Sequence, residues 1–139
     1  MSKPMAPDPA IGIWKLNVAE SSFELTPAFR SYVLKIQAWE DGYKARADVV
    51  DGQGNKSLAE IAYKFDGKDY LLKGSPLADT VTTMRIDQRT TGGIWKKDGK
   101  LVFTSKQFIS HDGKTQTDIR TGEDAHGRTI ADILVLEKQ

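Results

Sequence analysis

Residues 31–50, which read SYVLKIQAWEDGYKARADVV, decide the fold. Apolar and polar residues alternate on both sides of the Asp-Gly dipeptide at residues 41–42, and a period of two is typical of a half-buried β-strand. Asp-Gly favours a two-residue hairpin turn. A turn at that dipeptide sets Lys35 opposite Asp48 on one face and apolar residues opposite one another on the other face. This pattern predicts an antiparallel hairpin with one face against a core.

The same turn signal recurs at residues 51–52, 66–67, 98–99 and 112–113. A hairpin that turns at residues 66–67 shows the same separation of faces, because it pairs Glu60 with Lys73 on one face and apolar residues with one another on the other face. A turn at residues 98–99 sets Trp95 opposite Val102, and both faces of that hairpin look apolar. Strands are expected near residues 11–18, 31–40, 43–50, 57–65, 68–73, 79–87, 90–97, 100–110, 114–122 and 128–137.

Short turns between so many strands predict an all-β fold, an antiparallel up-and-down barrel of about 8–10 strands whose first and last strands meet. Closure removes the free edges that an open sheet of this kind would expose. At most one short helix is expected, because Ser21 and Glu24 fit a capping box but Pro27 follows closely. A loop without helix is the alternative for this segment.

Length and composition limit the organisation of the chain and the classes of partner. The chain has 139 residues, which predicts one domain over residues 11–139 after a disordered lead over residues 1–10. The formal charge of +1 argues against nucleic-acid binding, and no apolar stretch is long enough for a membrane-spanning helix. The lead lacks the apolar segment of a signal peptide, so a cytoplasmic protein is expected, or a periplasmic or secreted one if a signal peptide has been removed. Composition does not fix the oligomeric state.

The inward face of the expected barrel combines small residues with aromatic ones. Alanines at the middle of strands leave volume that a small molecule could fill, whereas a tapering, filled core is the alternative. Tyrosine hydroxyls would orient a bound molecule and the aromatic rings would supply apolar contact area. The expected ligand-binding residues are Tyr32, Leu34, Ile36, Ala38, Tyr43, Ala45, Ala47, Ile61, Tyr63, Phe65, Tyr70 and Leu72.

The residues that could carry chemistry are few. No cysteine is present, and His111 and His126 lack metal-ligand spacing and read as solvated turn residues, so neither a metal nor a cofactor is expected. The strand near 114–122 has no apolar face, so it is either exposed or faces a polar interior. We expect its charged residues, and Arg85 with Asp87, to lie on solvated outer faces. The alternative is that Arg85, Asp118 or Arg120 points inward, and these three are the candidate catalytic residues.

Both ends of the chain resemble a known group. Residues 12–16, Gly-Ile-Trp-Lys-Leu, resemble the Gly-x-Trp opening of the lipocalin and fatty-acid-binding families, and Leu-Glu-Lys at 136–138 resembles the closing strand of the latter. Together with the Asp-Gly-Lys hairpins, these ends are similar to small uncharacterised bacterial lipocalin-like proteins. The resemblance implies a calycin barrel that binds a small hydrophobic or amphipathic molecule, with Trp14 in a structural role. The Arg-x-Tyr pair that holds a fatty-acid carboxylate in that family is replaced here by Leu134 and Leu136.

Three hypotheses for the function follow from these expectations. The first is a non-enzymatic binder of a small hydrophobic molecule inside the barrel. The second is a cofactor-free enzyme, an isomerase, cyclase or hydrolase, that uses an inward Asp or Arg near the mouth of the barrel. The third is a filled barrel that acts through its outer surface. An ionisable group held away from water inside the barrel would favour the enzyme over the simple binder.

Overall fold

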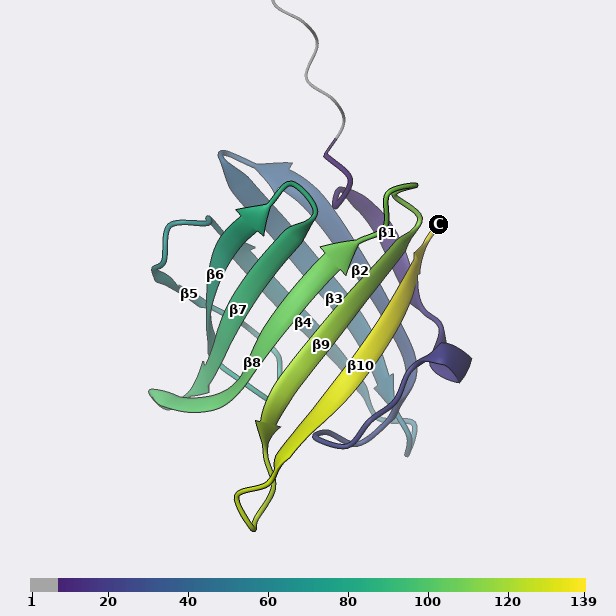
Figure 1. Ribbon diagram of the computed structural model, residues 1–139, viewed down its shortest axis with the longest axis vertical. Helices are drawn as coiled ribbons and strands as arrows, with labels where there is room; N and C mark the ends of the chain where they lie inside the picture. Colours follow the sequence, from purple (N-terminus) through teal and green to yellow (C-terminus); the bar gives the residue numbers. More distant parts are fainter. Residues whose placement is uncertain (1–7) are drawn as a thin grey trace, which may run out of the picture.

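The computed structural model describes residues 8–139, and residues 1–7 of the expected lead lie outside the described part of the chain. Ten strands and one short 3-10 helix make up the domain (Figure 1). Their bounds are β1 Gly12–Leu16, η1 Val18–Glu20, β2 Phe29–Trp39, β3 Gly42–Asp51, β4 Lys56–Tyr63, β5 Asp69–Leu71, β6 Thr80–Asp87, β7 Thr90–Lys97, β8 Lys100–Ile109, β9 Thr115–Glu123 and β10 Thr129–Lys138.

The strands form one antiparallel sheet that curls into a nearly closed barrel (Figure 1). Its order is β4-β3-β2-β1-β10-β9-β8-β7-β6-β5, so every strand lies beside its neighbours in sequence and β1 pairs with β10. The two ends of the sheet, β4 and β5, meet through an isolated bridge between Glu60 and Lys73, whose backbone groups exchange two hydrogen bonds of 2.9 Å. This arrangement confirms the predicted up-and-down fold, including the contact between Glu60 and Lys73.

The turn between β2 and β3 lies one residue earlier than the sequence predicts, which shifts the pairing of the two strands by two residues. Trp39 pairs with Gly42, so the turn lies at Glu40-Asp41, and Lys35 faces Arg46 instead of Asp48. The reason lies in Gly42: a Cβ atom there would come within 1.9 Å of the Tyr63 carbonyl oxygen, so this glycine serves a close approach between β3 and β4. A shift of two residues keeps every side chain on its predicted face.

The hairpin between β7 and β8 also differs from the predicted pairing. Lys97 pairs with Lys100, but an irregularity in the ladder then sets Trp95 opposite Phe103, where the sequence predicted Val102. Such an irregularity moves later residues of one strand to the other face. The rings of Trp95 and Phe103 stack with their centroids 5.0 Å apart, which explains how a hairpin that looks apolar on both sides buries its largest side chains together.

The segment between β1 and β2 is mostly loop. The only helical turn in residues 8–139 is η1, where the Asn17 side chain accepts a hydrogen bond from the Glu20 amide. The capping box expected at residues 21–24 does not form a helix; the Ser21 hydroxyl instead donates to the Asn17 carbonyl and accepts from the Val135 amide. The loop therefore packs along β10 rather than forming a lid of helices.

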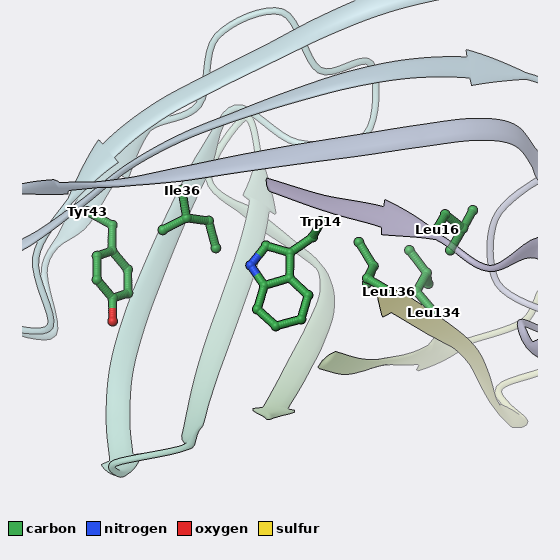
Figure 2. Close-up of a cluster of buried hydrophobic side chains, with 6 residues drawn as sticks. All are labelled: Trp14, Leu16, Ile36, Tyr43, Leu134 and Leu136. Carbon is green, nitrogen blue, oxygen red and sulfur yellow. The ribbon is translucent and has the colours of Figure 1, made fainter. Parts of the chain in front are cut away.

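A cluster of apolar side chains fills one end of the barrel, here called the closed end. Trp14 is fully buried and lies between Ile36 on one side and Leu16, Leu134 and Leu136 on the other (Figure 2). Its indole N–H donates to the Ala10 carbonyl over 2.9 Å. The same end is covered by the chain before β1, because Asp8 accepts a hydrogen bond from the Tyr43 hydroxyl. Trp14 therefore has the structural role that the Gly-x-Trp resemblance implies.

Candidate functional site

A cavity of about 440 Å³ lies inside the barrel, between the closed end and the loops at the opposite end. Its wall is largely apolar and comes from both halves of the sheet, with Ala45 and Ala47 on β3 facing Val81 and Trp95 on β6 and β7. Short side chains at the middle of β3 leave this space open, as the sequence predicted. Eight of the twelve expected ligand-binding residues line it: Tyr32, Leu34, Ile36, Ala45, Ala47, Ile61, Tyr63 and Leu72.

The other four expected residues lie elsewhere. Tyr43 and Phe65 pack edge to face against each other at the closed end, with ring centroids 5.2 Å apart. Ala38 lies near the end of β2 and is exposed to solvent. The hydroxyl of Tyr70 donates to the Asp66 carboxylate over 2.6 Å, in the connection between β4 and β5. These residues are on strands of the predicted barrel but beyond the length of the cavity.

The cavity reaches the loops opposite the closed end, and we call this end the mouth. Three segments contribute lining residues there: Thr26 and Pro27 before β2, residues 51 and 55–57 at the turn from β3 to β4, and residues 75–77 between β5 and β6. The side chain of Asp51 fixes the second of these segments, because it accepts hydrogen bonds from the amides of Gln53 and Asn55, each over 2.9 Å. The mouth is therefore built from loops with defined conformations.

A row of polar side chains on β9 faces the interior. Gln116, Asp118 and Arg120 are each only 3% exposed, so the expectation of a solvated outer face is wrong for Asp118 and Arg120. The strand has no apolar face because its inner face is polar, which is the second of the two alternatives in the sequence. Arg120 Nε donates to Asp118 Oδ2 over 3.1 Å. Gln116 and Arg120 line the cavity, whereas Asp118, between them on the same face of β9, does not.

Aromatic rings surround the Arg120 guanidinium. Its central carbon lies 5.3 Å from the centroid of the Trp95 ring and 5.4 Å from that of Phe103. Contacts of a cation with the faces of aromatic rings stabilise a guanidinium that has lost its water. Trp95 in turn donates its indole N–H to the Ser105 hydroxyl over 2.9 Å. Arg120 is thus held in one place between β7, β8 and its own strand.

Burial shifts the pKa values of the ionisable groups in this row. It raises the pKa of the Asp118 carboxyl, and the neighbouring Arg120 only partly opposes the shift. Burial also acts to lower the pKa of Arg120, but Asp118 and Tyr32 outweigh it and the net shift is upward. The pKa of the Tyr32 hydroxyl is raised, chiefly by burial, although the Arg120 charge acts against the increase. Arg120 therefore stays protonated beside the cavity.

A second buried carboxylate stands next to this row. Asp132 on β10 is directly across the ladder from Arg120 and is fully buried. It accepts hydrogen bonds from the backbone amides of Glu24 and Leu25, over 2.7 Å and 2.6 Å, and from both the amide and the hydroxyl of Thr26. Its negative charge also contributes to the raised pKa of Asp118. The carboxylate therefore fixes the mouth loop and adds a second negative charge to the interior.

Arg85, the third candidate catalytic residue, lies outside the cavity. Its Nη2 atom donates to the Tyr43 hydroxyl over 3.0 Å, and its guanidinium carbon lies 4.3 Å from the centroid of the Phe65 ring at the closed end. Asp87, from the same strand, is exposed as expected. Of the three candidates, the structure brings only Asp118 and Arg120 together, and only Arg120 reaches the lining.

Several lining residues were not among the expected site residues. Gln116 shares a face with Asp118 and Arg120, so the alternation on that strand could have identified it once the face was known to be the inner one. Trp95, Ser105 and Gln107 also line the cavity. Their orientation depends on the irregularity between β7 and β8, which leaves no signal in the alternation of residues. The same holds for Gly93, which leaves room for the contact between Trp95 and Ser105.

The histidines do not contribute to this site. His111 and His126 are exposed in the turns before β9 and β10, as the sequence predicts. Among residues 8–139, no group of three or more His, Cys, Asp or Glu side chains could hold a metal ion. No helix in the same residues is long and apolar enough to cross a lipid bilayer.

The topology and the internal cavity define the class of structure: a nearly closed, ten-stranded, up-and-down antiparallel β-barrel with space for a small molecule. No protein-family model, curated protein or solved structure matches this chain. Membership of the lipocalin or fatty-acid-binding families is therefore not confirmed, and the functional conclusions below depend on the geometry of the site.

Proposed function

We propose that this protein binds a small hydrophobic or amphipathic molecule inside the barrel. The main support is the cavity itself: its volume of about 440 Å³ is within the range of about 300–1,000 Å³ that is typical of small-molecule sites. Apolar side chains such as Leu34, Ala47 and Ile61 form most of its wall. Transfer of an apolar molecule from water to such a wall is favourable by roughly 25 cal/mol for each Å² of apolar surface that is buried.

Apart from polar residues at the mouth, such as Asp51 and Asn55, most polar groups of the wall lie on the side formed by β6 to β9. Gln107, Gln116 and Arg120 come from the adjacent strands β8 and β9, and Tyr32 lies close enough to Arg120 for each to alter the pKa of the other. An apolar pocket with a small number of fixed polar groups is the usual composition of a binding site that selects the orientation of its ligand. This arrangement supports an amphipathic ligand over a purely apolar one.

Native mass spectrometry of the purified protein tests the proposal directly, since a retained molecule adds its own mass to that of the chain. The second measurement is the binding of N-phenylnaphthylamine, an uncharged probe whose fluorescence rises in apolar sites. Ala47→Phe should fill the cavity and abolish binding of the probe, whereas Ala38→Phe, the same change at an exposed position, should leave binding unchanged. Unchanged binding by a folded Ala47→Phe variant would contradict the proposal.

A second candidate, a cofactor-free isomerase, cyclase or hydrolase, is favoured by the buried pair of Asp118 and Arg120. These two ionisable groups lie inside the barrel, and the raised pKa of Asp118 is a property that general acids and bases share. Arg120 would stabilise negative charge that develops on a carbonyl oxygen of the substrate. The test is a comparison of the mass and the chromatographic mobility of a bound molecule before and after incubation. A molecule recovered unchanged supports the binder over the enzyme.

A further inference from the structure

Gln116 lines the cavity, and its buried side chain has an unsatisfied hydrogen-bonding group. Its Oε1 atom is inaccessible to solvent and has no hydrogen-bond partner in the described part of the chain. A buried polar atom without a partner destabilises the folded state, so native structures rarely retain one without a reason. Gln116 follows the first residue of β9 and pairs with Leu136, which places it at the inner end of the cavity, far from the mouth.

Arg120 lies two steps along the same face, toward the mouth. Its Nε–H group donates to Asp118. The Nη groups of the guanidinium therefore remain for partners in the cavity, and Tyr32 is the protein side chain close to them. The inner polar wall thus offers an acceptor at Gln116 and donors at Arg120. A hydroxyl group matches both, because it donates one hydrogen bond and accepts others.

The charges around this wall argue against an anionic ligand. One guanidinium, that of Arg120, stands next to two buried carboxylates, Asp118 on its own strand and Asp132 across the ladder. A carboxylate ligand would lose its hydration and meet an arginine whose charge is already compensated. Two carboxyl groups beside one guanidinium leave no excess positive charge for an anionic ligand.

On the assumption that the barrel is a binder, as proposed above, we infer that its ligand is an uncharged amphipathic molecule whose hydroxyl group accepts from Arg120 and donates to Gln116 Oε1, once the Gln116 amide turns this atom toward the cavity. This inference names the chemical class of the ligand and excludes long-chain carboxylates as the preferred class. It makes Gln116 and Asp118 the residues that determine specificity. Gln116 would do so by a direct hydrogen bond, and Asp118 by neutralising the Arg120 charge.

Displacement of N-phenylnaphthylamine by a matched series of ligands tests the inference. Decanol, methyl nonyl ether, decane and decanoate share nearly the same apolar chain and differ in the head group. We expect decanol to bind about ten-fold more tightly than the ether, which lacks the donor, and decanoate to bind more weakly than either at neutral pH. Decanoate binding as tightly as decanol would overturn the inference but not the proposed function. Failure of the probe and of all four ligands to bind would overturn both.

Two variants assign the selectivity to residues. Gln116→Leu should remove the advantage of decanol over the ether and bind decane more tightly than the wild type does, because the change keeps the volume and replaces the amide with apolar surface. Asp118→Asn should raise the relative affinity for decanoate about ten-fold, since it frees the Arg120 charge at the same volume. If Asp118→Asn does not fold, the wild-type series and Gln116→Leu still decide the inference. An unchanged preference for decanol in a folded Gln116→Leu variant would contradict it.

Discussion

The carboxylate of Asp132 and the backbone of Thr26 join β10 to the loop at the mouth, although the two residues are 106 positions apart in the chain. The same carboxylate accepts from the amides of Glu24 and Leu25, so one buried side chain satisfies three successive amides. No helix forms in this segment, and Asp132 supplies the partners that helical hydrogen bonds would otherwise provide.

Asp132→Asn should therefore lower the free energy of unfolding by about 3 kcal/mol, because a neutral amide loses the charge-assisted bonds and presents N–H groups to N–H groups. Urea unfolding monitored by circular dichroism measures the change. Asp124→Asn is the matched control, since Asp124 accepts from the amides of His126 and Arg128 in an exposed turn. Its cost should stay below about 1 kcal/mol. Equal effects of the two variants would contradict the role assigned to Asp132.

Gln116→Leu should raise the free energy of unfolding of the ligand-free protein by about 1 kcal/mol. The reason is that the substitution removes a buried acceptor without a partner and replaces it with an apolar side chain of similar size. The measurement is again urea unfolding, on protein freed of any bound molecule by unfolding and refolding. A loss of stability would show that Gln116 makes a hydrogen bond that the protein needs for folding.

The close approach of β3 and β4 at Gly42 predicts that this glycine tolerates substitution less well than Gly67. A Cβ atom at Gly42 would overlap the carbonyl oxygen of Tyr63, whereas at Gly67 nothing lies within 4 Å and only the positive φ of 75° opposes an alanine. Gly67→Ala should cost about 1 kcal/mol of unfolding free energy. Gly42→Ala should cost clearly more, since β3 and β4 must separate locally. Thermal unfolding of the two variants, side by side, checks the order.

Stability should fall in alkaline solution because the tyrosines resist ionisation in the folded state. Burial and the hydrogen bond to Asp8 raise the pKa of Tyr43 from 10.0 to about 12, and burial also raises the pKa values of Tyr32 and Tyr63. A raised folded pKa means that the folded state holds the proton more strongly than the unfolded state. The contribution of Tyr43 is therefore complete below pH 10 and is lost as the pH rises from 10 to about 12.

Urea unfolding measured at several values between pH 8 and pH 12 checks this expectation, with the phenolate absorbance recorded in parallel. Tyr43→Phe should make the alkaline decrease less steep, because it removes one of the groups whose pKa differs between the two states. Tyr70→Phe is the comparison and should have a smaller effect, since the pKa of Tyr70 is raised mainly by an exposed hydrogen bond to Asp66. A decrease of the same steepness in Tyr43→Phe would contradict the assignment.

The sequence was sufficient for the fold because strand alternation and turn residues are local signals. The β2–β3 hairpin shows both the strength and the limit of this approach. The predicted faces of both strands were right, but the turn was displaced by one residue. The reason is that Gly42 packs against the β4 backbone, which is distant in sequence. At the other hairpin, the irregularity that sets Trp95 opposite Phe103 follows from packing between strands. Period-two patterns cannot contain that information.

The candidate site was harder to predict than the barrel. The β3 alanines revealed the cavity wall, since small residues in the middle of a strand are visible in the sequence. The polar inner face of β9 was not resolved, because an alternation of charged residues with threonines looks the same whichever face is inside. Only the pairing of Arg120 with a buried carboxylate, and its contact with the Trp95 ring, explains how such a row is stable away from water.

The single bridge from Glu60 to Lys73 leaves the barrel with a flank that is weaker than the rest of its circumference. Every other pair of adjoining strands is joined by a ladder of several residue pairs, so we expect thermal motion that widens the barrel to concentrate at the β4–β5 contact. We expect the amide hydrogens of both bridge residues to exchange with solvent faster than those at the centre of β9. A ligand whose chain is longer than the cavity would therefore extend most easily between β4 and β5, where local opening of the sheet costs the least free energy.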